Sequence, residues 1–474
     1  MNVAPSQVKI APRTAPNVIA RSSPAPHPVA TGIVLLYLFL VVSRGMELVS
    51  GLIGANPRLT MILMLVSLIA AVITGGLVAA LRTPIVLLFT AFTGWFLVTT
   101  LSSQWRGGSV MTLTTFWIPS YACILLIPSL ISSLDQCRKA CYAFAFSLGP
   151  MLMATVLFQA QVQGRDTILF GTLGNPNDLA FSLLLLVPFA VFVIQSEGLR
   201  SWKTFACAFA ILFALLKVFK TGSRAGMVTM VACFTILLLA GKLKTKLKMI
   251  GLVGAMVGIA AATVPRETLQ RYTTIFSGSS AESGMSADEL SAVESTQGRK
   301  MLFQESVRMT LEHPLFGVGP GIFSAALAVD QKARGEQQTW HEAHNSYTQI
   351  GSEMGLPAFF IYVAILVYSI KRTVAIYRRT RKDPARIVVS RIAASLSMAL
   401  VIFAICASFG NYSYSYQFPV LAGLVQAFDV CVRREMNATP STAPARLPMQ
   451  PVSPKPNSQV PIYVRNRRLR HNRA

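Results

Sequence analysis

The chain has 474 residues, of which 53% are hydrophobic and only 13% are charged. A soluble domain usually carries about 25% charged residues, so this composition excludes an ordinary soluble protein. The formal net charge of +24 indicates basic cytoplasmic loops and attraction to anionic lipids rather than nucleic-acid binding, which is the alternative for the basic C-terminal tail.

Long apolar runs alternate with short polar breaks along most of the chain. Runs of about 20 apolar residues match the thickness of a bilayer, which predicts an all-α polytopic membrane protein with about twelve transmembrane helices. About nine of these fall within residues 31–264 and about three within 346–432. The segments 1–30 and 433–474 are predicted to be disordered tails. The expected spans are 31–54, 59–81, 84–102, 112–132, 140–160, 177–195, 204–220, 225–241, 249–264, 346–370, 388–409 and 416–432.

The polar segment 265–345 is the one long break between the predicted spans. Lys and Arg concentrate in both tails and in alternate breaks, such as 371–386, whereas 265–345 carries more acidic than basic residues. Cytoplasmic loops carry the excess of Lys and Arg. We therefore expect both termini to be cytoplasmic and 265–345 to form one large loop on the opposite, non-cytoplasmic side, which is the periplasmic side if the protein is bacterial.

Two parts of this loop have distinct compositions. Residues 277–297 are small and polar, and we expect them to be mobile. The following stretch, GRKMLFQESVRMTLEHPLFGVG, has the pattern of an amphipathic helix that ends near Pro314. The glycines after Pro314 lack the Lys-Ser/Thr pair and the preceding strand of a nucleotide-binding loop.

Two short polar turns precede predicted spans on the same side of the membrane. In GTLGNPNDLAFS, Asn175 can cap a helix, and Asn177 and Asp178 lie in its first turn. In KTGSRAGMV, Ser223 can cap the next helix, which places Arg224 at the outer edge of the membrane. A well-formed helix start and a snorkelling arginine are the simpler explanations. A basic residue on the outer side nevertheless runs against the positive-inside rule, which favours a functional role for Arg224.

The stretch TWHEAHNSYTQIGSEMGLPAFF ends the large loop. Ser346 and Gln349 have the spacing of a capping box, so a helix is predicted to start there, directly after His344. The positive end of that helix lowers the pKa of a nearby imidazole and favours its neutral form, although a polar interfacial histidine without a task is the alternative. Gly355 lies about three turns further along, on nearly the same face as His344, where it would let a neighbouring helix approach closely.

These features place arginines and a neutral histidine on the outer face. The planar guanidinium group suits phosphate, and a neutral imidazole suits removal of a hydroxyl proton. Arg299 joins Arg224 as a candidate, although an ordinary surface residue is the alternative for it. The sequence holds no Asp-x-Asp motif, and we expect neither a metal nor another cofactor. The combination favours a lipid-linked diphosphate as the substrate.

The stretches GNPNDLA, TGSRAGMV, GRKMLFQES and HEAHNSYTQIGSEMGLPAFF resemble the O-antigen ligase and polymerase superfamily of bacterial membrane proteins. The resemblance implies a metal-independent, inverting glycosyltransferase of the GT-C-like class that uses a glycan on undecaprenyl diphosphate. Arg224 and Arg299 would hold the diphosphate, and His344 would orient or deprotonate the acceptor hydroxyl. Further substrate-binding candidates are Asn345, Asn177, Asp178 and Gly355.

The resemblance leaves the acceptor open. Members of the superfamily use lipid A-core, another lipid-linked repeat unit of O-antigen or exopolysaccharide, or Ser and Thr of proteins. It implies a multi-pass protein of the bacterial inner membrane that acts in the cell envelope. A polysaccharide transporter or flippase is the rival class, and such a protein would need ionisable residues within the membrane. Arg44 and Glu47 are the clearest such pair, and they can also simply pair with each other.

Overall fold

The protein is described by a computed structural model, which places residues 27–162, 165–169, 171, 173–240 and 287–438 and the single residues 246, 251, 254 and 258. The predicted ninth span lies almost wholly outside these residues, and so do most of both predicted tails and the loop segment 259–286. The chain divides into two compact units, 1–433 and 434–474. Everything below concerns the first unit.

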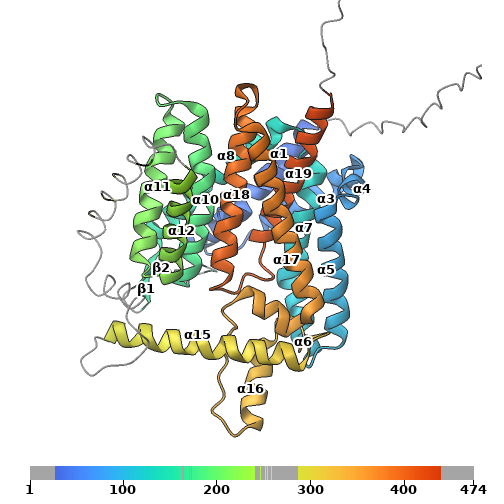
Figure 1. The fold of residues 1–474 in the computed structure, drawn as a ribbon, viewed down its shortest axis with the longest axis vertical. Coiled ribbons are helices and arrows are strands. Elements are labelled where there is room, and N and C mark those ends of the chain that lie inside the picture. Colours follow the sequence, from blue (N-terminus) through green and yellow to red (C-terminus); the bar gives the residue numbers. More distant parts are fainter. Residues whose placement is uncertain are drawn as a thin grey trace, which may run out of the picture. The chain divides into compact units, whose positions relative to one another are not determined.

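The described residues are almost entirely helical (Figure 1). One β-hairpin, in which Gln159 pairs with Ile168, replaces the end of the predicted span 140–160. The elements are α1 (Pro28–Val42), α2 (Gly45–Ile53), α3 (Leu59–Ile73), α4 (Gly76–Leu81), α5 (Pro84–Leu101), α6 (Arg106–Thr112), α7 (Ile118–Leu130), α8 (Leu134–Phe146), α9 (Leu148–Leu157), β1 (Gln159–Val162), β2 (Arg165–Ile168), α10 (Pro176–Glu197), α11 (Trp202–Lys220), α12 (Arg224–Ala240), α15 (Ala287–Glu312), α16 (Phe323–Ala333), α17 (Ser346–Thr380), α18 (Ile387–Ala407) and α19 (Gln417–Ala438).

Among the described residues, seven helices are long and apolar enough to cross a membrane, and the bent pair α1–α2 makes an eighth if it counts as one span. They are α5, α6 continued into α7, α8 continued into α9, α10, α11, α17 and α18 with the turn before it. α3 and α12 are apolar but shorter, and α19 is not among the seven. The protein is therefore a multi-pass helical membrane protein, but the structure does not support the predicted twelve full spans.

Two of the predicted spans are broken. The first changes direction at Arg44, where α1 and α2 meet at 70°, and Arg44 itself adopts the left-handed conformation with φ 53°. The second divides into α3 and α4 at Gly75, which has φ 68°. Hydropathy detects apolar length but not these local conformations, which explains why both segments were predicted as single helices.

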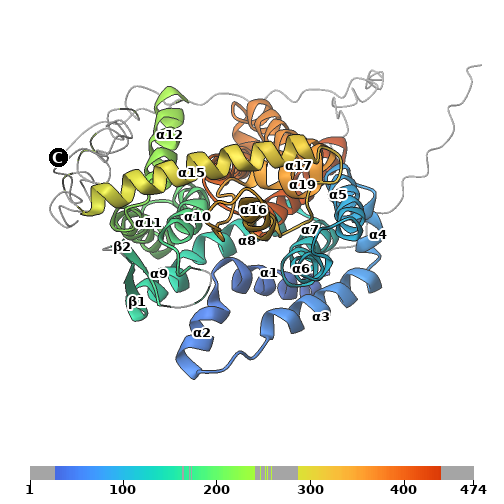
Figure 2. The same cartoon turned by 90° about the horizontal axis from the view of Figure 1, so that it is seen from below.

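α10, α17 and α18 form the centre of the bundle, where large aromatic side chains pack together. The ring of Phe403 lies 6.1 Å from that of Phe181 and 5.0 Å from that of Phe418. α15 lies across one end of this bundle, with α16 beyond it (Figures 1 and 2). The hairpin β1–β2 and the connection 408–416 lie at the same end. We call this end the loop face.

Contacts with α16 hold α15 in place on the loop face. Arg308 of α15 pairs with Asp330 of α16 at 2.8 Å, and Leu302 and Met309 are buried in a cluster with residues of α16. Where we expected residues 277–297 to be mobile, the part from Ala287 belongs to α15. The predicted amphipathic helix is therefore confirmed, but it begins earlier than its pattern indicated.

Candidate active site

The start of α17 is fixed by two neighbouring side chains. Asn345 caps the helix, because its Oδ1 accepts hydrogen bonds from the backbone N–H groups of Tyr347 at 3.0 Å and Thr348 at 3.2 Å. The sequence pattern assigned this cap to Ser346, which was wrong. The Ser346 hydroxyl instead donates to the carbonyl of Gly410 at 2.6 Å and accepts from the N–H of Tyr412 at 2.8 Å. The helix start is thereby joined to the 408–416 connection.

His344 precedes this cap in the left-handed conformation, with φ 52°. Burial lowers the pKa of His344 to about 4, and the nearby positive charges of Arg299 and His341 act in the same direction. The imidazole is therefore neutral at neutral pH, as the sequence predicted. The main cause is burial, however, and not the helix terminus.

Arg299 on α15 connects His344 to a second pair of side chains. Its charge acts on His344 and also on Tyr412. The hydroxyl of Tyr412 donates to Asp178 Oδ1 at 2.8 Å, at the start of α10. The Tyr412 hydrogen bond and the charge of Arg299 thus link three predicted residues, Arg299, His344 and Asp178. Sequence reasoning missed Tyr412, which lies in a short connection with no recognisable motif.

The two polar turns predicted separately lie side by side. Asn175 caps α10 by accepting from the Asn177 N–H at 2.9 Å, and Ser223 caps α12 by accepting from a backbone N–H at 3.1 Å, so both predicted caps are confirmed. Arg165 of β2 joins the turns, since its Nη2 donates to Asn177 Oδ1 at 3.0 Å and its Nε donates to the Thr221 carbonyl at 2.8 Å.

This arrangement places Arg224, half-buried, at the first position of α12. A methyl group added to Gly226, in the first turn of that helix, would lie 3.3 Å from the Cβ of Ala180. The start of α12, where Arg224 lies, therefore packs directly against the start of α10.

Gly355 interrupts α17, with φ 77° and ψ 176°. A methyl group there would lie 2.2 Å from the carbonyl oxygen of Leu315, and the next N–H, of Leu356, donates to the Pro314 carbonyl at 2.8 Å. The prediction of a close approach is confirmed, but the neighbour is a loop and not a helix. The expectation that His344 and Gly355 share one face of a continuous helix is wrong.

Three backbone carbonyls before this break have hydrogen-bond partners outside the helix. Carbonyls 352 and 353 accept hydrogen bonds from the N–H groups of Val318 and Gly319, both at 2.9 Å. Carbonyl 354 accepts from the indole of Trp95 at 2.9 Å. Non-helical backbone is tolerated at membrane depth where protein satisfies it, and here the loop after α15 does so.

Glu353 fixes the same loop through its side chain, which is fully buried. Its carboxylate accepts hydrogen bonds from the N–H of Gly321 at 2.9 Å and of Phe323 at 3.1 Å, and from the hydroxyl of Tyr414 at 2.5 Å. The glycine cluster of this loop thus packs closely against α17, since a methyl group added to Gly317 would lie 2.2 Å from the backbone of Glu353. A lone carboxylate in the apolar stretch GSEMGLPAFF was the signal that could have identified Glu353.

Among the residues that the structure describes, no group of three His, Cys, Asp or Glu side chains is placed to hold a metal ion. The site consists instead of arginine side chains, hydroxyl groups and one neutral imidazole. Such a set can bind an anion and accept a proton.

These observations define the class as a multi-pass helical membrane protein with arginine, hydroxyl and imidazole groups at one end. Residues 208–363 match the sequence model of the O-antigen ligase family. This match to an O-antigen ligase domain, over part of the chain, confirms the resemblance found in the sequence. The matched residues include Arg224, Arg299, His344 and Gly355. Comparison with curated proteins gave no match.

Proposed function

We propose that the protein transfers a glycan from undecaprenyl diphosphate to an acceptor hydroxyl, at the outer leaflet of the bacterial inner membrane. In this proposal both termini are cytoplasmic and the loop face is periplasmic. The O-antigen ligase domain supports a glycan transferase of the ligase or polymerase type. The distribution of Lys and Arg supports the orientation.

The observation that carries the proposal is the neutral imidazole of His344 beside the charge of Arg299, within that domain. In the proposed step, the acceptor oxygen forms a bond to the anomeric carbon while the bond from that carbon to the diphosphate oxygen breaks. The acceptor proton passes to the imidazole. Arg224 and Arg299 stabilise the charge that develops on the departing diphosphate, which needs no metal ion. A single displacement of this kind inverts the anomeric centre.

The low pKa of His344 suits a base only after the donor has bound. An imidazole with a pKa of about 4 accepts a proton weakly at neutral pH, because a base works best with a pKa near the operating pH. A diphosphate bound at Arg299 would offset the positive charge that lowers this pKa. The pKa of His344 would then rise, so donor binding would prepare the base for proton transfer.

The remaining predicted residues have contacts that favour positioning roles. The Asn345 side chain is used by the helix cap, that of Asn177 by Arg165, and Asp178 by Tyr412. Gly355 is enclosed by the backbone of the preceding loop. We therefore propose that these residues hold the turns that carry the two arginines and His344, and that Asp178 is the one nearest to substrate.

The acceptor distinguishes three versions of the proposed reaction. Lipid A-core as the acceptor gives ligation, a second lipid-linked repeat unit gives polymerisation, and a Ser or Thr side chain gives protein glycosylation. Gel analysis of the surface glycan of a deletion strain separates the first two. Complete loss of polymer on lipid A-core indicates a ligase, and retention of a single repeat indicates a polymerase.

The test of the proposal is transfer by the purified protein in nanodiscs that contain undecaprenyl-diphosphate-linked glycan and acceptor. Arg224→Ala should lower turnover at least about a hundredfold, as for loss of a charge-stabilising group. Arg224→Lys should also lower turnover if the diphosphate needs the two parallel N–H donors of a planar guanidinium group. The control is Arg106→Ala, an exposed residue that begins α6. Movement of glycan across vesicle membranes without any transfer would contradict the proposal and favour a transporter.

A further inference from the structure

Arg44 lies in an unusual position at the bend between α1 and α2. It adopts φ 53° and ψ 28°, a left-handed conformation that costs a residue with a side chain about 1–2 kcal/mol. Such strain persists where the surroundings impose it, and it clusters at ligand-binding sites. The contacts of the Arg44 side chain indicate what holds the residue in this conformation.

The guanidinium group of Arg44 is held on two sides. Its Nη1 donates to Glu47 Oε1 at 3.1 Å, and its Cζ lies 4.6 Å from the centre of the Tyr416 ring. Its Nε is buried and has no hydrogen-bond partner among the residues that the structure describes. A buried N–H without a partner costs about 1–3 kcal/mol, so this edge of the guanidinium is poised for an acceptor from outside the chain.

A second unpartnered group lies next to Tyr416. Gln417 is 6% exposed, and its Oε1 has no hydrogen-bond partner in the described part of the chain. An amide can offer either its oxygen or its N–H groups to a ligand by turning about its last bond. Two buried polar groups thus lack partners at Tyr416: Arg44 lies over its ring, and Gln417 is the next residue in the chain.

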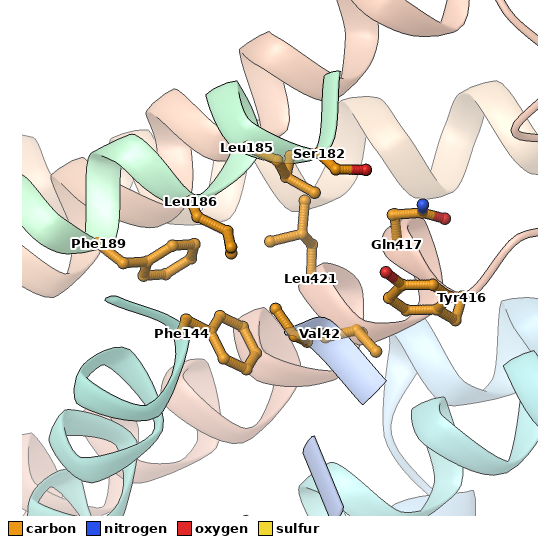
Figure 3. Close-up of a pocket in the computed structure, with 10 residues that line it drawn as sticks. Val42, Phe144, Ser182, Leu185, Leu186, Phe189, Tyr416, Gln417 and Leu421 are labelled. Atoms are coloured by element: carbon orange, nitrogen blue, oxygen red, sulfur yellow. The ribbon is translucent and has the colours of Figure 1, made fainter. Parts of the chain in front are cut away.

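Tyr416 and Gln417 also line a cavity between α1, α8, α10 and α19 (Figure 3). The polar atoms of Ser182, Tyr416 and Gln417 gather at one end of it, and the rings of Phe144 and Phe189 lie at the other (Figure 3). A polar end joined to an apolar wall fits the point in an amphiphile where a charged head meets its hydrocarbon chain.

Charge connects Arg44 to the candidate active site. Arg44 acts on the carboxylate of Asp178, which accepts the hydrogen bond of Tyr412, and Tyr412 in turn lies within reach of Arg299. An anion at Arg44 would therefore be linked by charge, through Asp178, Tyr412 and Arg299, to His344. This position indicates a reacting substrate rather than a bulk phospholipid.

We propose that Arg44 binds the lipid-side phosphate of an isoprenyl diphosphate, with the first carbons of its chain directed to the apolar wall of the cavity. This inference rests on the proposed function. Glu47 holds Nη1 and leaves the Nε edge to the phosphate, while Gln417 contacts the phosphate or the bridging oxygen. Arg224 and Arg299 remain for the glycan-side phosphate.

The test measures binding of farnesyl diphosphate to the full-length protein in detergent, by calorimetry and by the ligand-induced rise in unfolding temperature. Arg44→Gln should weaken binding at least about tenfold, as for loss of a hydrogen bond between charged groups. The matched control is Arg58→Gln, because Arg58 also precedes a helix with φ 51° but is exposed. That variant should bind like the wild type.

Phosphatidylglycerol and farnesol complete the experiment. Neither should displace farnesyl diphosphate, and displacement by phosphatidylglycerol at equal concentration would make Arg44 a bulk-lipid site and overturn the inference. Equal binding by the wild type and a folded Arg44→Gln variant would overturn it as well. If Arg44→Gln does not fold, Arg44→Lys replaces it in the same binding measurement. Lysine keeps the charge beside Glu47 but lacks the Nε edge, so this variant should also bind farnesyl diphosphate more weakly. No binding by the wild type would instead overturn the proposed function.

Discussion

The two ends of the helical segment Ser346–Met354 are built in opposite ways. At its start, His344 is half-buried, and its neutral imidazole lies within the range of the charges of Arg299 and His341. At its end, Glu353 is fully buried, and three carbonyls before the break at Gly355 have donors outside the helix. Both ends are polar, but at the end with Glu353 the polar groups are fixed by the hydrogen bonds described above.

In the proposed function, the start of this segment takes part in the reaction and its end provides structural support. We call the end at Glu353 and Gly355 the closed end and the end at His344 the open end. The closed end attaches the segment to the loop after α15, and that loop leads through α16 back to His344. Rigid support of this kind holds reacting groups in place. Substitutions at the closed end should therefore change stability first, whereas substitutions at the open end should change activity first.

Gly355→Ala should have the largest effect on stability. The new methyl group would lie 2.2 Å from a backbone oxygen in a residue with φ 77°, and left-handed strain with overpacking costs at least about 3 kcal/mol. Unfolding in detergent, followed by circular dichroism, measures the change. Gly94→Ala is the control, because a methyl group there meets nothing within 4 Å. Equal stability of the two variants would show that the break in α17 is not required.

His344→Ala should lower glycan transfer at least about a hundredfold, which is typical for loss of an acid–base group. The unfolding temperature should change little, because the helix cap belongs to Asn345. Turnover in nanodiscs and unfolding of the same preparation provide the two readouts. His341→Ala, which changes an exposed neighbouring histidine, should retain activity. Normal product from His344→Ala at equal expression would refute the assignment of the base.

The pH dependence of kcat/KM should report the pKa of His344 in the free protein. That pKa is lowered to about 4, so the neutral form predominates above pH 4 and is lost as the pH falls below it. We expect kcat/KM to fall about tenfold per pH unit below that point. An inflection near the ordinary histidine pKa of about 6.5 would show that burial does not control this group.

Local signals in the sequence predicted what depends on neighbouring residues. The caps at Asn175 and Ser223 and the start of α17 follow from residues within four positions, and the structure confirms them. The wrong cap at Ser346 has a long-range cause. Its hydroxyl is taken by the connection 408–416, which no local pattern can indicate.

The parts that could not be predicted depend on contacts between distant segments. Arg165 joins two turns that lie 12 and 56 positions away from it, and Tyr412 meets Asp178 across 234 positions. The break at Gly355 exists because a loop supplies the lost hydrogen bonds. A sequence can indicate that such residues are polar or small, but their partners follow only from the fold.

Tyr414→Phe should have the smallest of these effects, on stability alone. The variant removes one of three donors to the buried Glu353 carboxylate, and loss of a hydrogen bond to a charged group costs about 1–3 kcal/mol. Tyr121→Phe is the matched control, since its hydroxyl pairs with the neutral Thr90 hydroxyl at 2.8 Å, and it should cost less. If Tyr414→Phe instead lowered turnover tenfold with an unchanged unfolding temperature, Glu353 would belong to the chemistry. The closed end of the segment would then not be a separate support.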